Sequence, residues 1–418
     1  MDLVARGLHF PSGIAFDDHG RLYVAESGVG FGGSPAGGRV LRVEPDGSTV
    51  VLREDLGDPV NGLCFFEGYF YVSEGGWPGR IGRLSLDGEW KVLVDGLPGL
   101  GQYRTSRAIV GPDRRLYFGQ GALTNSGVIG LDSLEFPGLR RLPHQHDVPG
   151  WEVVLTGSNL ETDDPTSTSG RRARTGAFSP FGVETKPGQR IAGKLPCTAA
   201  VMRCQLDGSK LELLAWGLRN ACGLLYLPDG PLLAIDQGMT DRGSRPVGRV
   251  PDLLFEIYEG AWYGWPDFVG GVPVTDPRFR PARGAAPRFL LANHGELPPP
   301  ERPLLEFPLE AGASRLDAIP ESASRWPGQV LVALFGGERP PAGPQALRGG
   351  RSIVRIDPAT WALHPVKAGP FQRPVDVRVD PAGEAAYVAD FGEYELAPEG
   401  VRAKAGTGAV WRIPLRDL

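Results

Sequence analysis

Short apolar runs and turn residues alternate along the chain in one recurring order. Each copy has an apolar strand, a turn that carries Asp, Gly or Pro, and a second apolar strand that ends in a small or acidic residue, which is the pattern of a β-hairpin. The pattern occurs six times, at residues 11–27, 60–76, 106–121, 222–238, 314–337 and 374–392. Third strands such as GRVLRVEPDG and fourth strands such as TVVLREDL follow, the fourth strand of the fifth copy being residues 363–370. Six copies of such a unit predict an all-β, six-bladed β-propeller.

The two ends of the chain complete each other. The sixth copy has no fourth strand before Leu418, whereas residues 2–7 read as a fourth strand without a blade of their own. The run DLVARGLHFPSGI matches LELLAWGLRNACGL, which joins the third copy to the fourth. We therefore expect the N-terminal strand to close the ring, so that residues 1–418 make a single domain.

Two long segments interrupt the repeat. Residues 123–195 separate the second and third strands of the third copy, and residues 259–301 interrupt the fourth copy. Loops of this length often cover binding sites. We expect both to leave from equivalent or adjacent strand connections on one face and to form a lid over one mouth of the central channel.

Composition and charge narrow the possible partners. The 60 Gly and 40 Pro residues recur between apolar runs, which is typical of short strands joined by turns. The net charge of −5 and the pI of about 5.8 give no broad positive surface, so we expect neither nucleic acid nor membrane insertion. The apolar runs are too short for a membrane helix, and we expect a soluble protein. The compartment stays open, because a periplasmic or secreted protein whose signal peptide has been removed is compatible with the sequence.

Polar residues just before each hairpin should meet at one mouth of the channel, because the innermost strands of a propeller all begin there. These residues are Ser12, Asn61, Tyr103, Arg104, Thr105, Ser106, Arg219, Asn220, Ser314, Arg315 and Arg373, and the second strands end there in Glu26, Glu74, Gln120, Asp236 and Asp390. Arginines among amides and carboxylates suit a small polyanionic ligand, because guanidinium groups bind carboxylates in fixed geometry. The alternative is that these charges pair with one another.

Three segments resemble the pyrroloquinoline quinone (PQQ) dependent soluble glucose and sorbosone dehydrogenases, which are six-bladed propellers. They are IVGPDRRLYFGQG, WGLRNACGLLYLPDGPLLAIDQG and PDLLFEIYEGAWYGWPDF, and in the last of these Asp252, Glu256, Gly260 and residues 263–266 follow the family's spacing. The likeness of the repeats covers most of the chain outside the two insertions. It implies an oxidoreductase that oxidises a sugar or a related alcohol with PQQ and calcium.

The resemblance also implies roles for single residues. Arg219 and Asn220 would contact the quinone, and Arg373 would take the place of one of two arginines that bind it. The backbone carbonyls of Gly238 and Met239 would hold calcium against the cofactor, which suits an ion that accepts carbonyl oxygens in irregular geometry. The expected partner is a small-molecule substrate.

The chain departs from the family at the catalytic position, where Tyr103 replaces the histidine that acts as general base. A tyrosine, with an unperturbed pKa of about 10, is a poor base, although the neighbouring Arg104 would favour the phenolate. The second family arginine falls on Val375, and Ala221 replaces the proline that usually follows Arg-Asn. Tyr103 and Arg104 are therefore the candidate catalytic residues, at a site whose chemistry differs from that of the family.

Two other functions fit the same scaffold. One is a calcium-dependent lactonase or esterase whose channel metal would be held by Glu26, Asn61, Asn220 and Asp236. The other is a non-catalytic propeller that binds a small molecule or partner.

The first insertion carries the run HQHD at residues 144–147. His144 and His146 point the same way on an extended segment, so they could share a metal, and His146 could replace the missing base. The alternative is that both histidines are solvated residues of a loop.

Overall fold

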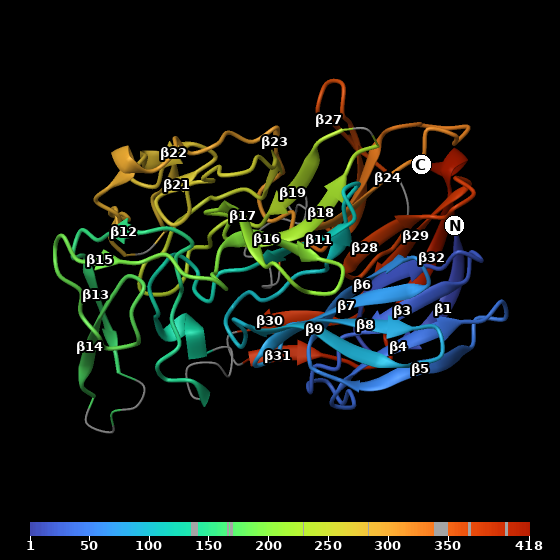
Figure 1. Ribbon diagram of the computed structural model, residues 1–418, viewed down its shortest axis with the longest axis horizontal. Helices are drawn as coiled ribbons and strands as arrows, with labels where there is room; N and C mark the ends of the chain where they lie inside the picture. Colours follow the sequence, from blue (N-terminus) through green and yellow to red (C-terminus); the bar gives the residue numbers. More distant parts are fainter. Residues whose placement is uncertain are drawn as a thin grey trace.

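Six four-stranded antiparallel sheets form the framework of the computed structural model (Figure 1). The structure describes residues 1–134, 141–164, 167, 170–228, 230–282, 284–337, 350–366, 369–397 and 400–418. The all-β, six-bladed propeller that the repeat predicts is therefore confirmed. The predicted fourth strand at residues 363–370 is described only in part, because residues 367–368 lie outside these ranges.

Each sheet is one blade, and the blades are lettered A to F. Blades A to C are β2 (Pro11–Phe16), β3 (Leu22–Glu26), β4 (Gly38–Val43) and β5 (Thr49–Leu56); β6 (Val60–Phe66), β7 (Tyr69–Glu74), β8 (Gly79–Ser85) and β9 (Trp90–Leu97); and β10 (Ile109–Val110), β11 (Arg115–Gln120), β16 (Ala200–Gln205) and β17 (Glu212–Trp216). Blades D to F are β18 (Ala221–Tyr226), β19 (Leu232–Asp236), β20 (Leu253–Glu256) and β23 (Leu305–Glu306); β24 (Ala313–Ala318), β25 (Val330–Leu334), β26 (Ser352–Asp357) and β27 (Ala362–Pro365); and β28 (Pro374–Val379), β29 (Ala385–Asp390), β32 (Gly408–Pro414) and β1 (Asp2–Leu8).

Smaller elements lie in the connections. The hairpins are β12 (Val153–Val154) with β15 (Arg190–Ile191), β13 (Asn159–Asp163) with β14 (Arg172–Gly176), β21 (Phe268–Val269) with β22 (Val272–Pro273), and β30 (Tyr394–Ala397) with β31 (Gly400–Ala403). Short 3-10 helices are η1 (Leu131–Leu134), η2 (Pro277–Phe279), η3 (His294–Glu296) and η5 (Leu415–Asp417). No helix in the described part of the chain has the length and apolar character needed to cross a membrane.

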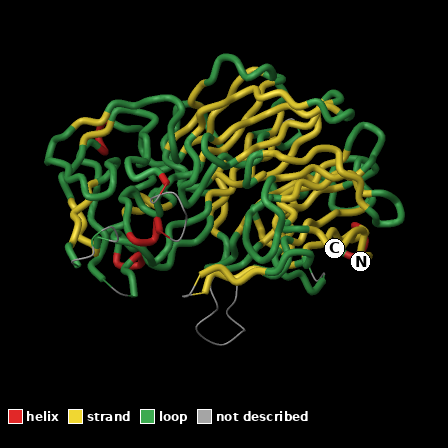
Figure 2. Tube along the Cα trace, turned by 90° about the horizontal axis from the view of Figure 1, so that it is seen from below, coloured by secondary structure: helices red, strands yellow, loops and turns green. Residues whose placement is uncertain are grey.

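The first strand of each blade lies innermost. The inner strands β2 and β6 contact each other, as do β18 and β24, and β28 contacts both β24 and β2. The N-terminal strand β1 pairs antiparallel with β32, with Asp2 opposite Arg412 and Leu8 opposite Gly408. The two chain ends therefore lie close together, as Figures 1 and 2 both show.

Aspartates in the hairpin turns explain why the chain reverses where it does. Asp17 Oδ1 accepts hydrogen bonds from the backbone N–H groups of His19 and Arg21, both at 2.9 Å. Asp380 Oδ1 accepts the Glu384 N–H at 2.8 Å in the corresponding turn of blade F. In these two hairpins, a short acceptor side chain thus satisfies backbone donors that the turn leaves unpaired, and it helps to fix the register.

The two insertions pack together in one lobe beside the sheets (Figures 1 and 2). The first insertion follows β11, the second strand of blade C, whereas the second insertion follows β20, the third strand of blade D. Because the second and third strands of a blade run antiparallel, the two insertions leave their blades at opposite ends, and the expectation of a single face is wrong. The second insertion then runs beside β17, where the Tyr263 N–H donates to the Trp216 carbonyl at 2.8 Å. It reaches the first insertion where the Ala292 N–H donates to the Val154 carbonyl at 2.7 Å. The role of the lobe as a lid stays a prediction.

A buried ion pair lies between the inner strands. Arg107 Nη1 donates to Asp376 Oδ1 at 3.0 Å and to Oδ2 at 3.2 Å, and the two side chains are 1% and 0% exposed. Asp376 Oδ2 also accepts the Ile14 N–H at 3.0 Å, so the pair joins blades C, F and A. Arg315 donates to the carbonyls of Ser12 and Asn61 beside it. Burial by itself raises the pKa of Asp376, but the surrounding arginines hold it below its usual value.

Asp376→Asn tests the weight of this ion pair. The change leaves the Arg107 charge buried without its carboxylate, so we expect the free energy of unfolding to fall by about 3–5 kcal/mol. Urea unfolding followed by circular dichroism measures the loss. Glu67→Gln, which removes the carboxylate of the exposed Arg114–Glu67 pair, is the control and should leave the free energy of unfolding nearly unchanged. Equally small losses of unfolding free energy in both variants would show that the buried pair contributes no more to stability than the exposed pair does.

Candidate functional site

Carboxylates at the ends of the second strands hold the loops that form the mouth. Each accepts a backbone N–H at 2.7 Å from the loop before the inner strand of its own blade: Glu26 from His9, Glu74 from Gly57, Asp236 from Asn220 and Asp390 from Arg373. All four carboxylates are at most 8% exposed. Burial raises the pKa of Glu74, and it raises the pKa of Asp236 to about 7. These predicted site residues therefore stabilise the mouth and do not line an open cavity.

Arg219 is buried, and protein atoms occupy most of its donors. Its Nε donates to the Asn125 carbonyl at 2.9 Å, and Nη2 donates to Asn125 Oδ1 at 2.8 Å. Its Nη1 donates to the carbonyls of Gln237 and Gly238, and the side chain is only 2% exposed. The guanidinium carbon lies 4.2 Å from the centroid of the Tyr103 ring, so the two side chains stack. The structure brings the predicted residues Tyr103 and Arg219 together, but as each other's partners.

The predicted calcium ligands lie beside the same arginine. The Gly238 carbonyl accepts the Arg219 guanidinium, and the Gly238 N–H donates to Asp252 Oδ1 at 3.0 Å. Met239 is 4% exposed. A calcium ion on the Gly238 carbonyl would lie against a guanidinium group, which like-charge repulsion disfavours. Within the described residues, no group of three or more His, Cys, Asp or Glu side chains is placed to hold a metal, and this includes the surroundings of His144 and His146.

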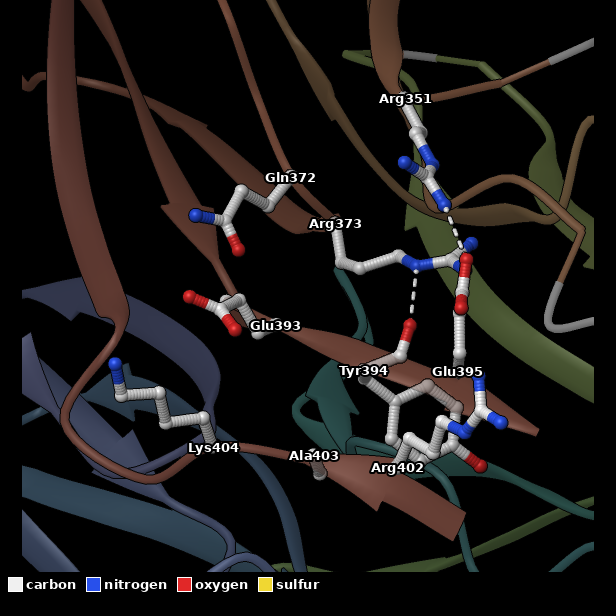
Figure 3. Close-up of a pocket in the computed structure, with 10 residues that line it drawn as sticks. Arg351, Gln372, Arg373, Glu393, Tyr394, Glu395, Arg402, Ala403 and Lys404 are labelled. Carbon is white, nitrogen blue, oxygen red and sulfur yellow. Dashed lines mark hydrogen bonds and ion pairs between the residues drawn. The ribbon is translucent and has the colours of Figure 1, made fainter. Parts of the chain in front are cut away.

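Arg373 lines a polar cavity of about 330 Å³ beside the β30–β31 hairpin (Figure 3). Its Nε donates to the Tyr394 carbonyl at 3.0 Å, its Nη1 donates to the carbonyls of Phe335 and Gly337, and the side chain is 1% exposed. Figure 3 shows Gln372, Glu393 and Lys404 on one side of this cavity. Arg373 therefore forms part of its wall, with its guanidinium committed to backbone carbonyls.

Arg104 differs from the other arginines of the mouth. Its guanidinium has no hydrogen-bond or ion-pair partner among the residues that the structure describes, although the side chain is half-buried. Burial lowers the pKa of Arg104, and the charges of Asp58 and Tyr394 oppose that effect. A methyl group added at Gly75 would lie 3.0 Å from both Cβ and Cδ of Arg104 and 2.4 Å from Asn61 Nδ2. The missing side chain at Gly75 thus leaves room for Arg104 and Asn61 at the mouth.

A second glycine, Gly121, allows Tyr103 and Asn220 to approach the backbone in the same way. A methyl group added at Gly121 would lie 2.3 Å from Tyr103 Cβ and 2.8 Å from Asn220 Oδ1. Asn61 Nδ2 donates to the Thr105 carbonyl at 2.7 Å, and Asn220 Nδ2 donates to Gln237 Oε1 at 2.8 Å. In the described part of the chain, the amide oxygens of Asn61 and Asn220 accept no hydrogen bond. Both remain available as acceptors beside Arg104.

Some residues of the site are not among those that the sequence pattern predicts. Arg107 stands at the same place in its inner strand as Gly62 and Arg315, so the repeat itself could have identified it. Asn125 and Tyr394 lie in an insertion and in a loop hairpin, which follow no repeat. No local pattern marks these two as neighbours of the mouth.

Comparisons with known proteins agree on the architecture alone. No family model matches the chain, and no curated protein matches it. Among solved structures, a glucose dehydrogenase matches with a TM-score of 0.58 and 14% identity, over 99% of this chain and 98% of that one. The PQQ domain of pyranose dehydrogenase from Coprinopsis cinerea matches at 0.57 and 15%, over 99% and 94%. The soluble aldose sugar dehydrogenase of Escherichia coli matches at 0.55 and 12%, over 98% of both chains.

These matches establish a shared fold. Residues of this chain do not fit PQQ and calcium in the arrangement that the structure has. Arg219 and Arg373 are nearly inaccessible, and their guanidinium groups donate to protein carbonyls. The Gly238 carbonyl is already taken by Arg219.

Glu74→Gln tests the electrostatics of the mouth. The raised pKa of Glu74 means that the folded state holds its proton more tightly than the unfolded state, so this group's contribution to stability falls as pH rises above its ordinary pKa. Glutamine can still accept the Gly57 N–H but does not titrate. We therefore expect the stability of the variant relative to the parent to increase in urea unfolding as the pH rises above about 4.5.

The control for this test is Asp95→Asn. Hydrogen bonds from Arg80 and from the Gly96 N–H lower the pKa of that exposed carboxylate, so its contribution is constant over the same range. A stability difference between the Glu74 variant and its parent that did not change with pH would contradict the assignment.

Proposed function

We propose that this protein binds a small, hydroxylated carboxylate, of the sugar-acid class, at the mouth of the propeller. The observation that carries the proposal is the half-buried Arg104 guanidinium, which has no partner within the described residues. A guanidinium that is partly removed from water and has no partner in the protein gains a favourable interaction when a ligand supplies the opposite charge. A carboxylate matches the guanidinium in geometry as well as in charge.

The neighbours of Arg104 suit the hydroxyl groups of such a ligand. The amide oxygens of Asn61 and Asn220 are free to accept hydrogen bonds, and Gly75 and Gly121 allow these two side chains to lie close to residues 103–104. Below the mouth, Arg107 and Arg315 both interact with the carboxylate of Asp376, so these three side chains together carry a net positive charge. An anion entering the mouth is therefore attracted by more than one guanidinium.

Oxidation of a sugar with a bound quinone is the second candidate. It is favoured by the fold shared with PQQ-dependent dehydrogenases over nearly the whole chain, and by the meeting of Tyr103, Arg219 and Asn220 at one mouth. It requires Arg219 to exchange its contacts with Asn125 and Gly238 for the quinone, which is why it ranks second. The lactonase hypothesis has less support, because Glu26 is paired with Arg39 and the pKa of Asp236 is raised by burial.

Calorimetric titration of gluconate and glucose into the parent and into Arg104→Gln tests the binding proposal. We expect gluconate to bind and glucose to bind far more weakly. Loss of a charge-assisted hydrogen bond should weaken gluconate binding by about 10- to 100-fold in the variant. Because Arg104 is unpartnered in the folded protein, the variant should unfold at an equal or higher urea concentration than the parent.

Arg80→Gln is the matched control, because it removes an exposed arginine of blade B whose partner is Asp95. Its gluconate affinity should equal that of the parent. Unchanged gluconate affinity in Arg104→Gln would refute the proposal. Calcium-dependent binding of PQQ without any binding of gluconate would replace it with the dehydrogenase function.

A further inference from the structure

A second cavity, of about 460 Å³, lies on the outer rim of the mouth face between blades B and C. We call it the Trp77 groove. Its walls come from the loops that follow β7 and β9 and from the first insertion. It is separate from the Arg104 site in its lining residues, and its volume falls in the range of small-molecule sites.

The segment HQHD forms one wall of the Trp77 groove, and buried hydrogen bonds hold it in place. Asp147 is 1% exposed; it accepts the Leu123 N–H at 2.7 Å and the Thr124 hydroxyl at 2.5 Å. Gln145 Nε2 donates to the Gly99 carbonyl. His144 and His146 both line the groove beside these two anchors. The HQHD segment, which the sequence suggested as a metal site, is therefore held in place as one wall of the Trp77 groove.

The groove combines an apolar surface with cations. Trp77 is 53% exposed, which is unusual for so large an apolar side chain, and Leu123 and Val148 lie on the same surface. Arg141 and Lys194 line the groove, and none of its described lining residues is acidic. A ligand with a flat apolar body can stack on the indole ring while an anionic group meets the two cations.

From this arrangement we infer that the Trp77 groove is a binding site for an aromatic carboxylate. The inference depends on charge complementarity, since the described lining has cations and no carboxylate, and on the exposed indole. It does not rest on the function proposed for Arg104. An apolar molecule without charge would leave Arg141 and Lys194 without a partner, and a neutral sugar would likewise bring no negative charge to them.

Two matched probes test the assignment: 2-naphthoate and its neutral analogue 2-naphthalenemethanol, measured by saturation-transfer NMR and calorimetry on the full chain. We expect 2-naphthoate to bind, and Trp77→Ala to weaken its binding by about tenfold through loss of stacking. The double variant Arg141→Gln, Lys194→Gln should weaken binding of 2-naphthoate by about tenfold and leave the neutral analogue unchanged. All three residues are exposed, so these variants should fold as the parent does.

Two controls distinguish binding in the Trp77 groove from binding elsewhere on the protein. Tyr258→Ala removes another large apolar side chain, 49% exposed, outside the groove and should have no effect on either probe. Arg104→Gln should leave 2-naphthoate binding unchanged. The proposal would be overturned if the two probes bound with equal affinity or if Trp77→Ala bound 2-naphthoate as well as the parent does. Loss of 2-naphthoate binding in Arg104→Gln would also overturn it, because the probe would then occupy the mouth.

Discussion

The buried ion pair between Arg107 and Asp376 sets how the inner strands of this propeller meet. The Asp376 carboxylate accepts hydrogen bonds from both Arg107 and the backbone N–H of Ile14, so this one group links blades A, C and F. The adjoining strand comes close because Gly62 has no side chain: a methyl group there would lie 3.1 Å from Arg107 Cβ. Both side chains of the pair are almost completely inaccessible to solvent.

Most polar groups of the mouth are occupied by the protein itself. The acidic ends of the second strands accept backbone N–H groups, and Arg219 and Arg373 donate to backbone carbonyls. Such pairing is what burial requires, because an unsatisfied polar group costs more than a hydrogen bond gains. Arg104 differs, because its guanidinium has no partner among the described residues. Departures of this kind concentrate at functional sites.

The lobe formed by the two insertions reaches the mouth through its own buried polar centre. Arg245 donates to Asp267 at 2.8 Å and to the carbonyls of Ser126 and Pro266, both at 2.9 Å. This fixes the stretch of the first insertion that carries Asn125, and Asn125 in turn holds Arg219. The insertions thus help to hold Arg219 in place, and the same lobe supplies one wall of the Trp77 groove.

The sequence by itself determined the six hairpins, the turns that contain Asp17 and Asp380, and the set of residues that gather at one mouth. These features follow from local patterns, since strand alternation and turn chemistry act over a few residues. Only the tertiary structure decided which of the gathered side chains are free. The guanidinium of Arg219 is occupied by Asn125, 94 positions away, whereas Arg104 finds no partner in the described chain. Pairing of this kind depends on how distant loops pack, and no spacing in the sequence records it.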